Sequence, residues 1–348
     1  SEDAQELLFF RSRERTALDI IAKDMKNFLE IEDKFLEERA SLLGSTDLEA
    51  VNRRILLLKD TSWMLDRDIL ANLHKIFALT GAKHIDAVSP AAFRKYRKLN
   101  LLLNALDRLE VRGRDSAGIQ LTFGMNMEDM ADVLLLLGQN GLEEQYTQRS
   151  QKGDLLNASL SVSSFPGGPK GSLCVTFTYK TFSIVGELGY NVSKLRSEIC
   201  KDRILQCFAN AGASFSTALT HTRWASVGAI TEENSHPVNN YSIGHSSPVC
   251  AAYPGFEAEI HAVLNGDIDN YAELRHALEI TDEKIAERIT TDTKIIPLQI
   301  QKYLRKGKNM EEAFLLAGKD FEGSHAIAVQ SNLEPGKLFL ALKGSGQS

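Results

Sequence analysis

Apolar side chains recur along residues 1–82 at the spacing of an amphipathic helix. The repeating positions are three, four or seven residues apart, with charged residues between them. They are Leu18, Ile21, Met25, Phe28 and Phe35. This heptad-like spacing predicts long helices that form a hairpin.

Two polar positions mark helix starts within this region. Thr46, followed three residues later by Glu49, is the signature of a capping box at the start of a second helix. Ser89 before Pro90 predicts a further helix, with serine as the N-cap and proline in the first turn. We therefore expect residues 1–95 to form a helical segment or insertion, and residues 96–348 to form a separate domain.

The pattern changes near residue 100, where short β-branched and apolar runs predict strands. These runs are residues 119–123, 173–184, 214–222, 259–264, 325–330 and 338–342. Helical patterns separate some of them, at residues 126–137, 193–211, 270–278, 291–304 and 310–318. Strands mixed with helices exclude an all-α protein and predict a layered α/β or α+β domain.

Composition and charge exclude several classes of protein. The chain has 348 residues, 43% hydrophobic and 25% charged, which is typical of a soluble globular protein of one large or two ordinary domains. The net charge of -6 is not accompanied by a basic block, so we expect no nucleic-acid partner. No apolar run is long enough to cross a bilayer, so we expect no membrane partner.

Cysteine and histidine usage bears on compartment and cofactors. The four cysteines form no CxxC pair and are sparse for a disulfide scaffold, which favours a reducing, cytoplasmic setting. The eight histidines show no HxxxH or similar ligand spacing, and no glycine-rich nucleotide loop is present. We therefore expect neither a metal nor another cofactor.

Four short segments carry candidate chemistry: residues 108–118 (RLEVRGRDSAG), 220–226 (THTRWAS), 264–270 (LNGDIDN) and 291–294 (TDTK). In the first, glycines relieve steric limits at a turn whose charges form either a buried network or ordinary surface salt bridges. In the second, Arg223 follows a strand. Its guanidinium can hold a carboxylate with two parallel hydrogen bonds. Alternatively, its aliphatic stem covers the edge of the core, and Trp224 is a packing residue.

The third and fourth segments also have two interpretations each. Asn265-Gly266 is foremost a turn signal, typical of a hairpin. A side-chain amide beside a glycine N–H also makes a two-donor oxyanion site, in which each donor contributes roughly 3 kcal/mol to transition-state stabilisation. Asp292 between two threonines is typical of a helix N-cap, or it accepts from an ammonium. Together the groups fit a free α-amino acid whose side-chain carbonyl is attacked.

In this order the segments resemble the glutaminase domain of glucosamine-6-phosphate synthase, a class II glutamine amidotransferase. Residues 234–237 (NSHP) are similar to that family's Asn-x-His-Pro segment, and residues 342–345 (LKGS) to its late basic-Gly-Ser turn. The match covers residues 95–345. Amidophosphoribosyltransferases share parts of the pattern, but Trp224 and Ala225 after Arg223 fit the sugar-phosphate branch better.

The resemblance implies an α+β fold of the N-terminal-nucleophile hydrolase kind, a four-layer αββα sandwich with two antiparallel sheets between helical layers. It implies that Arg223 binds the carboxylate of L-glutamine and that Asp292 binds its amino group. The side chain of Asn265 and the backbone N–H of Gly266 are the implied oxyanion hole.

Further roles follow from the same resemblance. Trp224 is implied to lie on a mobile loop that gates ammonia passage, and Arg112 near the amino terminus of the nucleophile. Ser226 and His236 are placed at the glutamine site. Ser226 replaces a threonine and keeps the hydroxyl. Val227 replaces a histidine, Arg114 a tyrosine, and Lys294 stands where the synthase usually has glutamate; these departures concern the pocket and the acceptor more than the glutamine contacts.

The family's attacking group is an amino-terminal cysteine, followed by Gly-Ile and an apolar strand, with its own α-amine as base. Residues 1–8 instead predict a helix with an acidic first turn, and no internal cysteine has a free amine. One explanation is a Cys-Gly-Ile strand preceding Ser1 in the full protein; the other is that the strand was lost. We favour the first, because losing a central strand leaves its neighbours with unpaired backbone groups.

Three functions remain open. The first is a glutamine amidotransferase of amino-sugar biosynthesis. It would hydrolyse L-glutamine to glutamate and ammonia, and pass the ammonia to a sugar-isomerase-type synthase domain in the same or a partner polypeptide. The second is an inactive glutamine-binding regulatory domain. The third is a scaffold in which residues 1–95 mediate assembly, with a homo-oligomer as one outcome.

Overall fold

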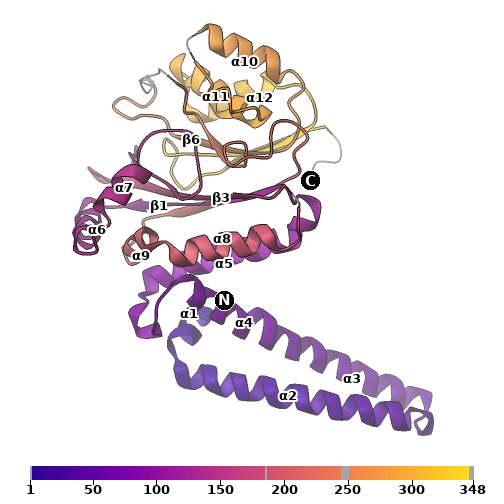
Figure 1. Cartoon of the computed structure of the whole chain (residues 1–348). Helices are drawn as coiled ribbons and strands as arrows, with labels where there is room; N and C mark the ends of the chain where they lie inside the picture. Colours follow the sequence, from indigo (N-terminus) through magenta and orange to yellow (C-terminus); the bar gives the residue numbers. More distant parts are fainter. Residues whose placement is uncertain (1, 185, 244–250, 282, 345–348) are drawn as a thin grey trace. The chain divides into compact units, whose positions relative to one another are not determined.

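The computed structural model describes residues 2–184, 186–243, 251–281 and 283–344. The chain divides into two compact units, Ser1–Asn100 and Leu101–Ser348, which we call unit 1 and unit 2 (Figure 1). No helix in the described part of the chain combines the length and apolar character that a membrane crossing requires.

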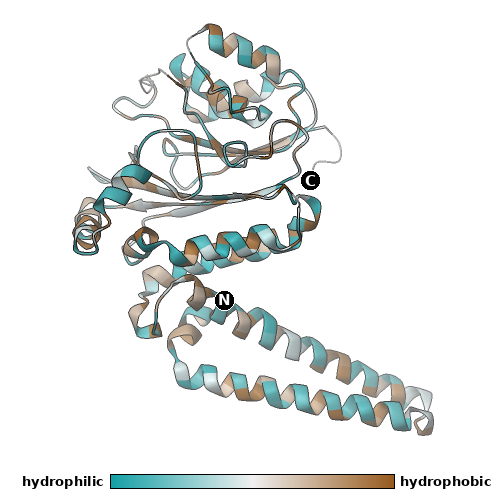
Figure 2. Ribbon diagram, in the orientation of Figure 1, coloured by the Kyte–Doolittle hydropathy of each residue, from teal (hydrophilic) through white to brown (hydrophobic). Residues whose placement is uncertain are grey.

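Unit 1 is helical, as the apolar spacing predicts. Its elements are α1 (Glu2–Phe10), α2 (Ser12–Arg39), η1 (Ala40–Leu42), α3 (Ser45–Trp63), the π-helical η2 (Met64–Leu70), α4 (Ala71–Leu79), η3 (Ile85–Ala87) and the start of α5 (Pro90–Leu109). Apolar residues recur along both α2 and α3 (Figure 2). The two helices therefore have the amphipathic composition expected of a hairpin.

The two predicted helix starts in unit 1 differ in outcome. Ser89 is confirmed as a cap, because its Oγ accepts a hydrogen bond from the backbone N–H of Ala92 at 3.1 Å. The predicted capping box at Thr46 is wrong. Helix α3 begins at Ser45 after Gly44, and no side chain caps it, so Thr46 already lies inside the first turn.

Within the described residues of unit 2 there are two antiparallel sheets, each of four strands. The first has the order β2-β3-β1-β4, and the second β5-β6-β7-β8. The strands are β1 (Ser116–Met125), β2 (Ser159–Ser164), β3 (Leu173–Phe182), β4 (Ser216–Arg223), β5 (Val238–Asn239), β6 (Ile260–Gly266), β7 (His325–Ser331) and β8 (Phe339–Lys343).

The helices of unit 2 lie outside the sheets. After the end of α5 and η4 (Glu110–Arg112) they are α6 (Met127–Gln139), α7 (Glu143–Arg149), α8 (Tyr190–Lys201), α9 (Arg203–Ala209), α10 (Tyr271–Ile280), η5 (Asp292–Lys294), α11 (Ile295–Arg305) and α12 (Met310–Asp320). Helices α8 and α9 cover the first sheet, and α10 to α12 cover the second (Figure 1). The expected α+β sandwich of four layers, αββα, is confirmed.

Strand β1 shows how the sequence builds two kinds of layer. Its apolar side chains face the helices: Phe123 stacks on Phe177 of β3, which makes an edge-to-face contact with Phe208 of α9. Its polar side chains face the second sheet, where Gln120 and Thr122 both accept hydrogen bonds from Gln330 of β7, at 2.7 and 2.6 Å. The sheet–sheet interface is therefore polar, and the sheet–helix interface apolar.

Several short elements escape the apolar pattern. Strand β2 is serine-rich, β5 has two residues, and α7 is polar throughout. The helix predicted over residues 193–211 is two helices, because Asp202 caps a new start. Its carboxylate accepts from the backbone N–H groups of Ile204 and Leu205 at 2.9 and 3.0 Å.

Gly118 lies where the segment just before β5 passes close to β1. A Cβ at this position would stand 1.9 Å from the carbonyl oxygen of His236, so no side chain fits. We expect Gly118→Ala to lower the free energy of unfolding by roughly 2–3 kcal/mol, because two backbones must move apart. Urea denaturation followed by circular dichroism measures this change.

The matched control is Gly153→Ala, where a Cβ would meet no atom within 4 Å. This variant should change the free energy of unfolding by less than about 0.5 kcal/mol. Equal stabilities of the two variants would contradict the close approach at Gly118.

Candidate functional site

The first two sequence segments meet at the paired ends of β1 and β4. Ser116 lies opposite Arg223 in the ladder. Just before β1, the backbone N–H of Asp115 donates to the carbonyl of Arg223 at 3.1 Å, and the Asp115 carboxylate accepts from the N–H of Ala225 at 2.8 Å. Asp115 thus holds the chain on both sides of Trp224 and fixes the exit of β4.

The third and fourth segments join the same place. The Asp292 carboxylate accepts a hydrogen bond from the backbone N–H of Ile268 at 2.9 Å. The Ser226 hydroxyl donates to Asp267 at 2.5 Å. Four segments that are distant in sequence therefore converge at one end of the sandwich.

The NSHP segment supports the loop that carries Asp292. The side-chain oxygen of Asn234, which is fully buried, accepts from the N–H groups of Thr290 and Thr291 at 2.7 and 2.9 Å. His236 Nε2 lies 2.7 Å from the hydroxyl of Thr293, and His236 Nδ1 lies 3.2 Å from Nδ1 of His221 on β4. His236 is thus a buried link between β4 and the Asp292 loop.

Arg223 and Asp292 are two buried charges with opposite signs, 5% and 4% exposed. Burial lowers the pKa of Arg223, against the charges of Asp292 and Asp115. Burial also raises the pKa of Asp292, despite the hydrogen bond from Ile268. Among the described residues, neither side chain has an ion-pair partner within 4.0 Å. Each lies in the field of the other without direct contact.

The guanidinium of Arg223 is turned toward the loop that follows β4. It donates to the carbonyl of Val227, and to that of Ala229 at 3.3 Å. Nearby on β1, the Ser116 hydroxyl is buried and has no hydrogen-bond partner among the described residues. Buried polar groups without partners are uncommon, and they indicate a place where a further group can bind.

The structure corrects two local interpretations. Asp292 is not a helix N-cap: Thr291 precedes the 3-10 turn η5 without a side-chain cap, and the Asp292 carboxylate points to Ile268 instead. Asn265-Gly266 does not form a hairpin, because Gly266 ends β6 and the chain continues to α10. Gly266 has φ 109°, and a Cβ there would stand 2.1 Å from the carbonyl oxygen of Ser324.

The remaining predicted site residues lie at the surface of this end. Trp224 is 73% exposed. Ser226, Asn265 and Arg112 are also exposed, Arg112 at the end of η4. The late LKGS turn lies beside Ser324, since a Cβ on Gly344 would meet the Ser324 side chain at 2.3 Å. The carbonyl of Ser324 in turn accepts from the N–H of Asp267 in the third segment at 3.2 Å. Ser345 of this turn lies outside the described residues. The functional roles assigned to these side chains stay predictions.

The sequence pattern assigns no role to three ionisable residues here: Glu110 and Lys180, which are buried, and His221, which is partly buried. Glu110 accepts from the N–H groups of Gly189 and Asn191 at 2.8 and 3.1 Å, at the start of α8. His221 contacts His236. Lys180 on β3 is paired across from Gly118, and burial lowers its pKa to about 7 while its Nζ donates to the carbonyl of Leu155 at 2.8 Å. The partners of all three residues are distant in the sequence.

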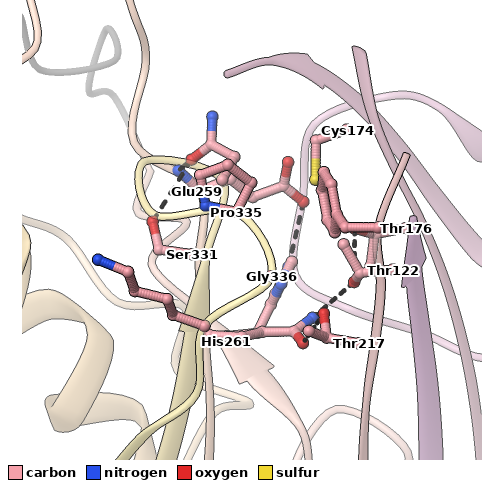
Figure 3. A pocket seen from close by; sticks show the side chains of 13 residues that line it. Thr122, Cys174, Thr176, Thr217, Glu259, His261, Ser331, Pro335 and Gly336 are labelled. Carbon is pink, nitrogen blue, oxygen red and sulfur yellow. Dashed lines mark hydrogen bonds and ion pairs between the residues drawn. The ribbon is translucent and has the colours of Figure 1, made fainter. Parts of the chain in front are cut away.

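A small cavity lies between the sheets, but away from these residues (Figure 3). It measures about 10 Å³, room for one water molecule. Thr217, Glu259, His261 and Gln330 are among its lining residues. Thr217 precedes Arg223 by six residues on β4, about 20 Å along a strand. The cavity is therefore at the other end of the sandwich and is not the predicted site.

Cys174 and Cys207 lack the lowered thiol pKa of a nucleophile. Burial raises the pKa of the Cys174 thiol far above its usual range, and burial also raises the pKa of Cys207. Cys250 lies outside the described residues. Across the described ranges, no three histidine, cysteine or acidic side chains are grouped so as to hold a metal ion.

Comparison with known proteins provides evidence that is independent of the site geometry. No family model matches the chain. Glutamine–fructose-6-phosphate aminotransferase (isomerizing) from Methanothermobacter thermautotrophicus is 37% identical over 127 residues, 36% of this chain and 19% of that relative. The protein of the same name from Methanosarcina mazei is 30% identical over 208 residues, 58% of this chain and 29% of that relative.

The expected resemblance to class II glutamine amidotransferases is confirmed. The chain spans less than a third of the length of either aminotransferase. Among solved structures, the allosteric regulatory enzyme of purine biosynthesis is 16% identical with a TM-score of 0.33. The match covers 66% of this chain and 38% of the chain of that enzyme. Glutamine phosphoribosylpyrophosphate amidotransferase from B. subtilis is 15% identical with a TM-score of 0.30. The match covers 65% of this chain and 37% of the chain of that amidotransferase.

The adjacent histidines His221 and His236 predict a pH dependence of stability. Burial lowers the pKa of His221 from 6.5 to about 4, and that of His236 well below its usual value. Below about pH 6.5 the unfolded chain therefore takes up protons that the folded chain does not bind. The free energy of unfolding thus decreases as the pH is lowered. We expect a loss of roughly 1–2 kcal/mol between pH 7 and pH 5 from His221.

Urea denaturation at the two pH values measures this loss. His221→Gln should show a smaller loss than the wild type, because one titrating group is removed. His276→Gln, at an exposed position on α10, is the matched control and should keep the wild-type loss. A loss in His221→Gln as large as in the control would contradict the prediction.

Proposed function

We propose that unit 2 binds L-glutamine and forms the glutaminase half of a glutamine amidotransferase. In this proposal glutamine is hydrolysed to glutamate and ammonia, and the ammonia passes to a sugar-isomerase-type domain in the same or a partner polypeptide. The aminotransferases that this chain resembles support that assignment by their names, which join glutamine to fructose 6-phosphate.

One observation carries the proposal: a buried arginine and a buried aspartate lie in each other's field without pairing. A free α-amino acid is a zwitterion, so its carboxylate suits Arg223 and its ammonium suits Asp292. Binding such a ligand would neutralise both charges at once, and an ammonium beside Asp292 would offset the cost of burying that carboxylate. A neutral ligand gains neither interaction.

The other side chains extend this arrangement. The Asn265 side chain and the Gly266 N–H act as oxyanion donors at the end of β6. Exposed Trp224 and Ser226 belong to the loop beside Arg223, where Trp224 gates ammonia and Ser226 holds Asp267. Arg112 lies near the amino terminus of the attacking group.

His236 acts through its neighbours. Both of its ring nitrogens lie within hydrogen-bond distance of protein groups, Thr293 and His221, and the residue is 3% exposed. It therefore holds the Asp292 loop at a fixed distance from β4. The attacking group of this proposal is an amino-terminal cysteine with its own amine as base, as in the family that the chain resembles.

Asp292→Asn tests the ammonium contact. Calorimetry should show that the wild type binds L-glutamine. It should show about 10–100-fold weaker binding of 4-carbamoylbutanoate, which lacks the amino group. Asp292→Asn should lose most of that preference, because the amide cannot pair with an ammonium. Asp132→Asn, at an exposed position of α6, is the matched control and should behave as the wild type.

Arg223→Lys should weaken the binding of both ligands by the same factor, because both carry the carboxylate that Arg223 binds in this proposal. Absence of L-glutamine binding to the folded wild type would overturn the site. Glutamate release by the full-length natural protein tests hydrolysis separately. Binding without release would leave a glutamine-binding regulatory domain.

A further inference from the structure

Ser116 begins β1 and lies in the strand ladder between Phe182 of β3 and Arg223 of β4. Side chains alternate between the two faces of a sheet, and directly paired residues point to the same face. Gln120, on the same face of β1, reaches Gln330 of the second sheet at 2.7 Å. Ser116 and Arg223 therefore both point from the first sheet toward the second, with their Cβ atoms about 5 Å apart.

The hydroxyl of Ser116 differs from the other polar groups on this face of β1. Gln120 donates to Thr178, directly across on β3, at 2.9 Å, and Thr122 lies 3.0 Å from the hydroxyl of the threonine across from it. The residue across from Ser116 is Phe182, whose side chain has no polar atom. Ser116 is 1% exposed, and within the described ranges its hydroxyl has no hydrogen-bond partner. Burying a hydroxyl unpaired costs free energy, which indicates a partner from outside these residues.

Arg223 keeps hydrogen-bond donors for the same partner. A guanidinium carries five N–H groups. One from each terminal nitrogen donates to a carbonyl of the following loop, at Val227 and at Ala229. The Nε–H is the donor closest to the strand, and it takes no part in the hydrogen bonds that Arg223 makes in the described part of the chain. The donor nearest to Ser116 is therefore available.

The guanidinium decides which kind of group can bind beside Ser116. A hydroxyl can donate or accept, whereas arginine only donates. A group that binds both must therefore accept hydrogen bonds, and beside a positive charge an anion binds more strongly than a neutral acceptor. An ammonium would be repelled by Arg223 and attracted to Asp292 instead. A carboxylate oxygen has room for more than one hydrogen bond, so a carboxylate can accept from the Nε–H and the hydroxyl together.

We propose that Ser116 is a substrate-binding residue whose hydroxyl donates to the carboxylate that Arg223 binds. This inference rests on the proposed glutamine site and adds a third contact to it. Ser116 and Arg223 hold the carboxylate, and Asp292 holds the ammonium. Because the serine side chain is short, the carboxylate lies close to the paired ends of β1 and β4. Ser116 thereby sets how deeply the amino acid enters the site.

A bound water molecule is the other partner that a buried hydroxyl can have. The two partners predict different behaviour of a variant without the hydroxyl. If the hydroxyl serves only a water molecule, its removal leaves ligand affinity unchanged. If it donates to the substrate carboxylate, its removal weakens every ligand that carries this carboxylate.

Ser116→Ala in the full chain is the first test. Calorimetry should show about 10–100-fold weaker binding of L-glutamine than in the wild type, because a hydrogen bond to a charged group is lost. Binding of 4-carbamoylbutanoate, which keeps the carboxylate and lacks the amino group, should weaken by the same factor. Asp292→Asn, in contrast, should weaken mainly the ligand that carries the amino group.

Ser172→Ala is the matched control. Ser172 is also buried, at 8% exposure, and it immediately precedes β3. This end of β3 pairs with Met125, so Ser172 lies at the opposite end of the sheet from Ser116. The control variant should bind both ligands with the affinity of the wild type.

The stability of the protein without ligand is a second readout. Urea denaturation should give Ser116→Ala a midpoint equal to or above that of the wild type, since the variant removes a hydroxyl that has no protein partner. At one concentration of L-glutamine, the midpoint of the wild type should rise more than that of the variant, because stabilisation by a ligand increases with its affinity. Circular dichroism should show the same fold for both proteins.

Three results would overturn the role of Ser116 alone. The first is unchanged affinity in Ser116→Ala, which leaves a water molecule as the partner. The second is an equal loss of affinity in Ser116→Ala and Ser172→Ala. The third is a midpoint of Ser116→Ala below that of the wild type, which reveals a partner within the protein. A wild type that does not bind L-glutamine overturns the proposed site as a whole, and the role of Ser116 with it.

Discussion

The polar layer between the two sheets of unit 2 is the constraint on which that unit depends. Gln330 donates to Gln120 and Thr122 across the layer, and Thr217 donates to Gln330 in return. Such groups are costly to bury without partners. A shift of β1 by one residue would turn Ile119 and its apolar neighbours into this layer, so the register of the whole sandwich is fixed.

A fixed register decides which side chains meet at the strand ends. Ser116 is held opposite Arg223 in one sheet, and Gly266 opposite His325 in the other. The close approach of the His236 carbonyl to Gly118 then ties the sheets together near this end. Arg223 ends β4, and Asp292 lies in η5 after α10. They remain in each other's field because strand pairing fixes Arg223, while Ile268, two residues after β6, holds Asp292 by a hydrogen bond.

Local patterns predicted the apolar elements of the fold and the segments of the site, but not the contacts between them. Strands such as β6 and β7 are visible because their side chains are largely apolar. Serine-rich β2 is a strand only because β3 pairs with it. Asp292 resembled a cap in sequence, since threonines flank it; its real partner, Ile268, is 24 residues away. Long-range partners of this kind, including Asn234 for Thr290, leave no local trace.

Lys294 shows how a departure from the family pattern is absorbed. The sequence resemblance implies a glutamate at this position in the synthase, and burial lowers the pKa of the lysine found here. A buried ammonium needs a partner, which Asp154 supplies at 2.8 Å, with both side chains almost fully buried. Removing Asp154 alone would leave an unpaired charge two residues from Asp292. The departure therefore concerns the electrostatic support of the Asp292 loop, while the Asp292 carboxylate keeps its hydrogen bonds from Ile268 and from the neighbouring threonine hydroxyls.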